Sequence, residues 1–303
     1  MISRQITDNW MMTTNRQDTY SHLWHSLLPI YDDGEAKAVV RLLLDEGFGL
    51  TMTDIVCGKT DELPAPDKER LAAMMTRLRQ GEPVQYVLGR ADFCGRAFHV
   101  EKGVLIPRPE TEELCRMIVA EYNKPYCALQ PPVPLQVLDV GTGSGCIAVT
   151  LALDLHNAEI TAWDVSPDAL LIARRNAKKL GATVNLQLQD ALNAPEDEDK
   201  WDIIVSNPPY IANHERKDMS RNVLDNEPEL ALFVPNDNPL LFYRAIAVYA
   251  GRALNSGGKL FFEINPLHAN ELHQMLMQEG FGEIRFVKDN FGKVRFCHCR
   301  RDF

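Results

Sequence analysis

Basic residues are scarce in this chain relative to acidic ones. Its 303 residues include 32 Lys and Arg against 42 Asp and Glu, which gives a formal net charge of −10 at pH 7. Proteins that bind nucleic acid generally neutralise its phosphates with a basic face, so this balance disfavours direct nucleic-acid binding. The sequence also lacks an apolar run long enough to cross a bilayer. We therefore expect neither nucleic acid nor a membrane among its partners.

Paired cysteines are absent as well. The seven cysteines are odd in number and show no repeated pair spacing, which indicates reduced thiols. Cys297-His298-Cys299 is close to a metal-binding pattern, but no second ligand pair lies near it and alternation along a strand explains the spacing. The first residues show no positively charged segment followed by a long apolar one. We expect a cytoplasmic protein without a metal site.

The N-terminal part of the chain has helical periodicity. Residues 1–17 are polar and aperiodic, and we expect them to be disordered. Within residues 18–89, two apolar stripes with i, i+3, i+4, i+7 spacing predict a small helical bundle, in which Asp33 and Asp67 would cap helices. Residues 90–106 are richer in aromatic and β-branched side chains around a Cys-Gly turn, which predicts a β-hairpin linker.

Residues 107–303 alternate between strand and helix patterns, which is typical of the α/β class. One segment, 211–239, is long and poor in regular pattern, and in a compact domain this predicts a functional loop over the site.

One predicted strand ends abruptly in Asn207-Pro208-Pro209-Tyr210. The prolines lack backbone donors and hold the preceding residues extended, so a stiff loop leaves the strand end, where the ligand crevice of an open α/β sheet lies. The side-chain carbonyl of Asn207 and the backbone carbonyl of Pro208 could accept hydrogen bonds from both N–H groups of an amide or amino nitrogen. The ring of Tyr210 would cover the planar target group. Taken alone, the segment is equally compatible with an ordinary turn.

A glycine-rich turn follows an earlier predicted strand. The turn is Gly141-Thr142-Gly143-Ser144-Gly145, and its glycines let the backbone approach a ligand closely. Cys146 stands where the helix-packing third glycine of a dinucleotide fingerprint would fall, which favours a smaller nucleoside ligand. Acids end the next two strand patterns: Asp164, about 20 residues after the turn, can accept from ribose hydroxyls, and Asp190 follows the third strand.

These four signals together resemble the class I S-adenosylmethionine-dependent methyltransferases. The resemblance implies a Rossmann-like domain over residues 107–303, with a seven-stranded, mostly parallel sheet, and S-adenosyl-L-methionine as the cofactor. Carried over to this sequence, it implies that Gly141 to Gly145, Asp164 and Asn207 contact the cofactor. The Asp190-Ala191 region would lie by the adenine. Ala191 stands where some members carry an aromatic residue, so another apolar side chain would have to cover the ring.

Three further segments make the resemblance narrower. They look like those of the release-factor glutamine N5-methyltransferases, the HemK or PrmC family, and two of them lie outside the shared cofactor fold. The segments are Glu82-Pro83-Val84-Gln85-Tyr86-Val87-Leu88-Gly89, Leu105-Ile106-Pro107-Arg108-Pro109-Glu110-Thr111-Glu112 and Asn226-Glu227-Pro228.

The narrower resemblance implies a specific reaction. A methyl group would pass from S-adenosylmethionine to the side-chain amide nitrogen of the glutamine in the Gly-Gly-Gln motif of peptide-chain release factors. Asn207, Pro208 and Tyr210 would be the catalytic residues, and together with Pro209 they would hold the glutamine. Residues 18–89 would recognise the protein substrate. We add Phe93, in the hairpin, as a candidate wall of the glutamine pocket.

Three other functions fit parts of the pattern. An adenine-N6 methyltransferase would share Asn-Pro-Pro-Tyr, because a flipped base presents a similar exocyclic amine, but the acidic balance of the chain disfavours it. A related glutamine methyltransferase could modify a ribosomal protein instead. A cofactor-binding scaffold without activity fits least well, since the residues needed for the chemistry are intact.

Overall fold

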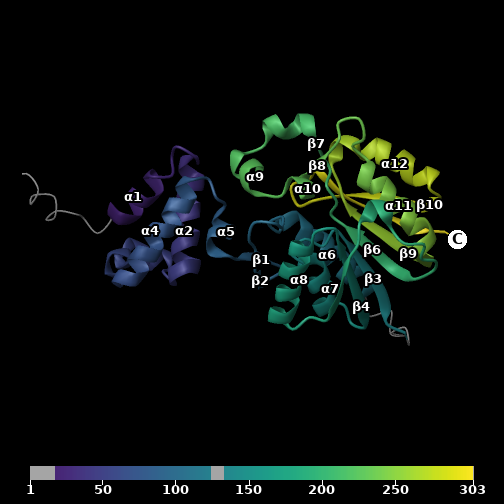
Figure 1. Cartoon of the computed structure of the whole chain (residues 1–303), viewed down its shortest axis with the longest axis horizontal. Coiled ribbons are helices and arrows are strands. Elements are labelled where there is room, and N and C mark those ends of the chain that lie inside the picture. Colours follow the sequence, from purple (N-terminus) through teal and green to yellow (C-terminus); the bar gives the residue numbers. More distant parts are fainter. Residues whose placement is uncertain (1–17, 124–132, 303) are drawn as a thin grey trace, which may run out of the picture. The chain divides into compact units, whose positions relative to one another are not determined.

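The computed structural model of the protein describes residues 18–123 and 133–302, and it divides the chain into two compact units, Met1–Gly89 and Arg90–Phe303 (Figure 1). The residues predicted to be disordered, 1–17, lie outside the described part of the chain.

The first unit is a helical bundle around its own apolar core. Apolar side chains recur at helical spacing along α2, and the buried residues Val40, Leu43 and Leu44 contribute to the core cluster. The helices are α1 (Asp18–His25), α2 (Asp33–Phe48), α3 (Met52–Val56), the 3₁₀ helix η1 (Lys59–Glu62), α4 (Ala65–Arg79) and α5 (Val84–Leu88).

Both predicted helix caps in this bundle are wrong by a few residues. Asp32, not Asp33, is the N-cap of α2, and its side chain accepts from the backbone N–H of Glu35 at 2.8 Å. Asp67 lies inside the first turn of α4, whose N-cap is Pro64. An acidic residue is favourable throughout the first turn because of the helix dipole, so composition alone does not identify the cap.

The second unit begins with a hairpin and continues as an α/β sandwich. Strands β1 (Ala91–Phe93) and β2 (Arg96–Phe98) pair antiparallel, with Cys94 and Gly95 at positive φ in the turn between them. The strands that follow are β3 (Leu135–Val140), β4 (Ala158–Asp164), β5 (Val184–Leu188), β6 (Trp201–Ser206), β9 (Leu254–Glu263), β10 (Phe281–Lys288) and β11 (Val294–Arg301).

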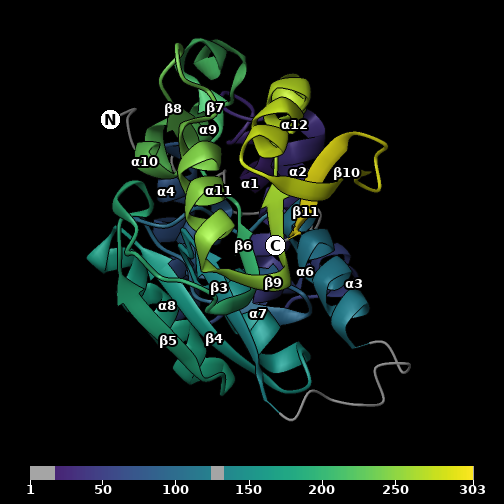
Figure 2. The same ribbon diagram turned by 90° about the vertical axis from the view of Figure 1, so that its right-hand side faces the viewer.

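These seven strands form one sheet in the order β10-β11-β9-β6-β3-β4-β5. Figure 2 shows β5 and β10 at opposite edges. β11 pairs antiparallel with both of its neighbours, and the other pairings are parallel. The predicted seven-stranded, mostly parallel sheet is confirmed. The chain passes from β3 to β4 on one side and later returns to β6 on the other, so the carboxyl ends of β3 and β6 flank the crevice where such sheets bind ligands.

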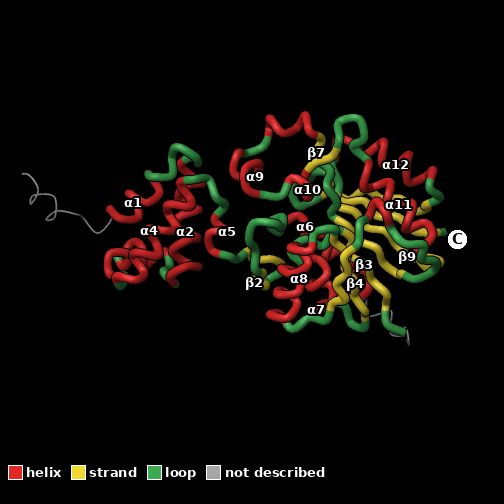
Figure 3. Tube along the Cα trace, viewed as in Figure 1, coloured by secondary structure: helices red, strands yellow, loops and turns green. Residues whose placement is uncertain are grey.

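Helices cover both faces of the sheet (Figure 3). Alternate residues of β3 face opposite cores: Leu138 packs with α11 and α12, whereas Val137 packs with α6, α7 and α8. These helices are α6 (Pro109–Tyr122), α7 (Cys146–Asp154), α8 (Pro167–Leu180), α11 (Leu241–Ala253) and α12 (Ala269–Gln278), the last preceded by η4 (Pro266–His268).

The segment 211–239, predicted to lack regular structure, is built largely of short elements. Each is too short to show a period in the sequence, which explains the error. They are β7 (Ile211–Ala212), η3 (Asn213–Asp218), α9 (Arg221–Asn226), α10 (Glu229–Leu232) and β8 (Phe233–Val234); a further short helix, η2 (Ala191–Asn193), follows β5.

The Cys297-His298-Cys299 segment lies in β11. Cys297 and Cys299 are buried in the apolar core, and the ring of His298 stacks on Phe261. Across residues 18–123 and 133–302, no group of three or more His, Cys, Asp or Glu side chains is arranged to hold a metal ion. In the same ranges no helix has the length and apolarity needed to span a membrane.

Candidate active site

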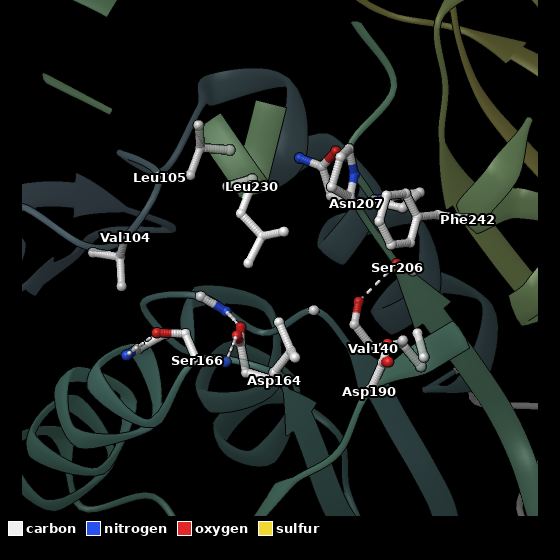
Figure 4. Close-up of a pocket in the computed structure, with 18 of the residues that line it drawn as sticks. Val104, Leu105, Val140, Asp164, Ser166, Asp190, Ser206, Asn207, Leu230 and Phe242 are labelled. Atoms are coloured by element: carbon white, nitrogen blue, oxygen red, sulfur yellow. Dashed lines mark hydrogen bonds between the residues drawn. The ribbon is translucent and has the colours of Figure 1, made fainter. Parts of the chain in front are cut away.

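A cavity opens at the carboxyl ends of β3, β4 and β6 (Figure 4). Figure 4 shows Asp164 and Ser166 on one side, Leu105 and Asn207 on the other, and Leu230 between them. Among the predicted site residues, those that line this cavity are Gly141, Gly143, Asp164, Asp190, Ala191, Asn207, Pro208 and Pro209.

Two glycines of the turn after β3 leave room for a ligand. Gly141 and Gly143 adopt φ of +76° and +54°, and a Cβ added to either would meet no atom within 4 Å. Both line the cavity. Other side chains would be strained at these φ values and would project into open space, so glycine keeps the backbone accessible.

Gly145 serves a different purpose. It is the N-cap of α7, and a Cβ there would lie 3.0 Å from the Cβ and 3.2 Å from the Cα of Ala173 in α8. This contact packs the start of α7 against α8, whereas the third glycine of a dinucleotide fingerprint packs its helix against a strand. The expectation of a smaller nucleoside ligand, drawn from Cys146, therefore stays a prediction.

Thr142 and Ser144 are buried and are not among the residues that line the cavity. The hydroxyl of Thr142 donates to Asp139 Oδ2 at 2.7 Å, and the backbone N–H of Ala148 donates to the same oxygen at 3.1 Å. Burial raises the pKa of Asp139 to about 7, with these two donors opposing the rise. The buried Thr142 side chain, bonded to Asp139, therefore supports the turn from inside the protein.

Asp164 joins the glycine turn to the start of α8. Its Oδ2 accepts from the backbone N–H of Gly143 at 2.8 Å, and its Oδ1 accepts from the backbone N–H of Ser166 at 2.9 Å. Burial raises the pKa of Asp164, and these backbone donors lower it again. A carboxylate offers about four lone-pair directions, so Asp164 keeps acceptor capacity for a donor in the cavity that it lines.

The wall beside Ala191 is apolar. Phe242 and Ile246 from α11 line the same cavity as Ala191, and α11 packs against η2. Phe242 is an aromatic residue in this lining, whereas position 191 carries alanine, and the sequence offered no signal to select Phe242 from the other apolar residues of its helix.

A second cavity adjoins the first. Four residues line both of them: Leu105, Asn207, Pro208 and Ala231. Tyr210, Arg108 and Glu263 line the second cavity only. The Asn-Pro-Pro-Tyr loop therefore lies between the two cavities, and Asn207 and Pro208 line both.

A buried hydrogen-bond network supports Asn207 from behind. Its Nδ2 donates to Thr111 Oγ1 at 3.2 Å, and Thr111 Oγ1 donates to Glu263 Oε2 at 2.6 Å. The hydroxyl of Tyr210 donates to the other oxygen of Glu263 at 3.2 Å, and burial raises the pKa of Tyr210. The sequence did not predict Thr111 and Glu263 as site residues, although Thr111 lies in one of the segments that carry the family resemblance.

Arg108 and Glu227 were also missed as site residues. The Arg108 guanidinium donates to Glu227 Oε1 at 2.5 Å, and the backbone N–H of Ile106 donates to Glu227 Oε2 at 3.1 Å. The Glu227 carboxylate is buried. This pair ties the segment before α6 to the junction of α9 and α10, and thereby fixes one side of the second cavity.

The structure does not bring Phe93 to either cavity. Its side chain is fully buried in the core and lies edge-on to Phe98, with ring centroids 5.8 Å apart. In the described part of the chain neither cavity includes it in its lining. A large apolar residue in a short hairpin is more readily explained by packing, which the sequence could not distinguish from substrate contact.

The fold and this site define a class I methyltransferase, since a seven-stranded, mostly parallel sheet carries a glycine turn and an acid at the ends of β3 and β4. Family models agree: residues 128–230 match the methyltransferase small domain and residues 25–89 match the PrmC N-terminal domain. The chain belongs to the release factor glutamine methyltransferase family.

Two curated relatives establish that membership. The release factor glutamine methyltransferase of Bacteroides thetaiotaomicron is 44% identical over 282 residues, covering 93% of this chain and 98% of that protein. The enzyme of the same name from Flavobacterium psychrophilum is 38% identical over 270 residues, covering 89% and 93%. The predicted family is confirmed, and it is favoured over the ribosomal-protein and adenine-N6 alternatives.

A solved structure supports the fold alone. The 16S rRNA N2 G1207 methyltransferase of T. thermophilus, in complex with AdoMet and guanosine, superposes with a TM-score of 0.50 at 21% identity. The match covers 70% of this chain and 49% of that one.

Proposed function

We propose that this protein transfers the methyl group of S-adenosylmethionine to the side-chain amide nitrogen of the glutamine in the Gly-Gly-Gln motif of peptide-chain release factors. The observation that carries the proposal is the wall shared by the two cavities, where Asn207 and Pro208 face both. A donor in the first cavity and a glutamine side chain in the second would meet at these residues. The family name of the relatives supplies the substrate class.

The first cavity suits S-adenosylmethionine. Gly141 and Gly143 leave the space that a Cβ would fill, and Asp164 has free acceptor directions for ribose hydroxyls. Asp190 and Ala191 would lie by the adenine, with Phe242 covering its face. We propose that Thr142, Ser144 and Gly145 contribute through the shape of the turn.

The bound cofactor supplies a methyl group on a positively charged sulfur, which an aligned nitrogen lone pair can attack. The Oδ1 of Asn207 and the carbonyl oxygen of Pro208 would accept from the two N–H groups of the substrate amide and aim its lone pair. The apolar surface of the cavities would exclude water. The nitrogen can lose its proton after the N–C bond forms, so the chain needs no strong base.

Tyr210 would act mainly as a wall of the glutamine pocket. Its hydroxyl is held by Glu263, which fixes the ring at the edge of the second cavity. Residues 18–89 would contact the protein substrate. Because release factors act in the cytoplasm, we expect the enzyme to be located there as well. We do not assign Phe93 a substrate contact, because its side chain is buried in the core.

The test is methyl transfer from labelled S-adenosylmethionine to purified release factor. A Gly-Gly-Ala version of the factor, a ribosomal protein and DNA serve as parallel substrates. We expect label on the wild-type factor alone. Label on the ribosomal protein would keep the glutamine chemistry and change the partner, whereas label on DNA would refute the substrate class.

A further inference from the structure

We propose that Thr111 and Glu263 are positioning residues that hold the side-chain amide of Asn207 with its oxygen toward the substrate. The inference rests on the proposed function, because it explains how one residue of the site is oriented. It concerns Thr111 on α6, which lines neither cavity, and the buried Glu263 on β9, which lines the second cavity.

The direction of the hydrogen bonds follows from counting protons. Thr111 has one hydroxyl proton, and an ionised Glu263 can only accept, so that proton points to Glu263 Oε2 at 2.6 Å. The Thr111 oxygen is then free only to accept, and it accepts from Asn207 Nδ2 at 3.2 Å. The Oδ1 of Asn207 is thereby turned away from Thr111, and in the described part of the chain no donor bonds to it.

This orientation matters because the two ends of an amide are chemically opposite. An outward Oδ1 can accept from a substrate N–H, whereas an outward Nδ2 would present a second donor and repel it. Sterically the two orientations are nearly equivalent, so packing alone cannot choose between them. Thr111 and Glu263 make the choice because both are buried and cannot exchange partners with water.

Glu263 has neighbours that favour its charged form and others that oppose it. Thr111 and Tyr210 donate to its two oxygens, and Arg295 on β11 attracts it, although Arg295 also pairs with Asp289 at 3.3 Å. Glu110 on α6 repels it, and Tyr243 on α11 donates to its backbone carbonyl.

Burial nevertheless dominates and raises the pKa of the Glu263 carboxyl. As the pH falls through that pKa, a protonated Glu263 could donate to Thr111. The Thr111 proton would then turn toward Asn207 and favour the flipped amide. The turnover of release-factor methylation should therefore decline on the acid side.

The first experiment compares full-length Thr111→Val and Thr111→Ser with the wild type on purified release factor. Valine keeps the shape and removes the hydroxyl, so we expect kcat to fall about tenfold or more with an unchanged Kd for S-adenosylmethionine. Serine keeps the hydroxyl and should stay within about threefold of the wild type. Thr150→Val is the matched control, because Thr150 is buried and its hydroxyl has no partner in the described part of the chain.

The second experiment measures kcat against pH for Glu263→Gln. Glutamine does not titrate in this range, so we expect its kcat to lack the acid-side decline of the wild type. Thermal unfolding of each variant separates a positioning effect from a folding defect.

The inference is overturned if Thr111→Val turns over like the wild type, if serine is no better than valine, or if Glu263→Gln keeps the wild-type profile. A wild-type enzyme that methylates no release factor would instead refute the proposed function, and this inference with it.

Discussion

At the scale of single residues, Asn207 is the side chain on which methyl transfer should depend most. It faces both cavities. Asn207→Ala removes the acceptor that aims the substrate amide, and we expect kcat to fall by about 100-fold or more with little change in cofactor affinity. Steady-state methylation and calorimetric titration with S-adenosylmethionine measure the two quantities. Intact turnover would contradict the role.

Asp164 should behave in the opposite way. Asp164→Ala removes the carboxylate that would accept from the ribose hydroxyls. It also leaves the backbone N–H groups of Gly143 and Ser166 without this acceptor. Since a hydrogen bond to a charged group is worth about 1.5–3 kcal/mol, we expect the Kd for S-adenosylmethionine to rise about tenfold or more. Turnover at saturating cofactor should change much less. An unaltered Kd would exclude Asp164 from the cofactor site.

Asp139 should make folding stability depend on pH. Its pKa is raised from 3.8 to about 7 in the folded protein, so the folded state takes up a proton more readily than the unfolded chain. Its contribution to the free energy of unfolding is therefore fully present below about pH 4 and is lost as the pH rises to about 7. The loss is about 1.4 kcal/mol for each pH unit that separates the folded and unfolded pKa values.

The substitution Asp139→Asn removes this titration and can still accept from Thr142 and Ala148. We expect a flatter dependence of the free energy of unfolding between about pH 4 and pH 7, measured by urea denaturation. Equal pH slopes for the variant and the wild type would show that Asp139 does not titrate there.

At the scale of elements, the contact between the glycine turn and α8 sets the shape of the site. Gly145→Ala would combine an unfavourable φ of +81° with a clash against Ala173. We expect a loss of stability of about 2–4 kcal/mol and weaker cofactor binding. Gly257→Ala is the matched control, because Gly257 has φ of +77° and nothing within 4 Å of an added Cβ. Equal losses in the two variants would show that the close approach costs nothing.

The sequence predicts some of these elements and not others. Strand β4 ends at Asp164 and β5 ends shortly before Asp190, where the strand patterns predicted them, because apolar and β-branched residues followed by an acid indicate a strand and its carboxyl end. The short helices α9 and α10 were missed, since four to six residues show no period. The network through Thr111 and Glu263 joins residues 152 positions apart, and no local pattern reports such a pairing.

At the scale of the whole molecule, each unit has its own apolar core. The two core clusters of the second unit contain no residue of the first, and every residue that lines either cavity lies between Gly103 and Glu263. We expect a chain of residues 90–303 to fold and to bind S-adenosylmethionine within about threefold of the full-length Kd.

Removal of residues 1–89 should instead impair recognition of the protein substrate. If the helical unit contributes a second contact with the release factor, kcat/KM for the intact factor should fall about tenfold or more. The control is a short glutamine-containing peptide, which is too small to make this second contact. Its kcat/KM should fall much less. Equal losses for both substrates would argue against a recognition role.

The wall shared by the two cavities also bears on the order of events in turnover. Leu105, Asn207, Pro208 and Ala231 face both spaces, so each proposed ligand has a space of its own and neither must leave before the other arrives. Both would have to be present at once, which corresponds to sequential rather than ping-pong kinetics. The spent nucleoside could then be exchanged for a fresh one while the release factor stays bound.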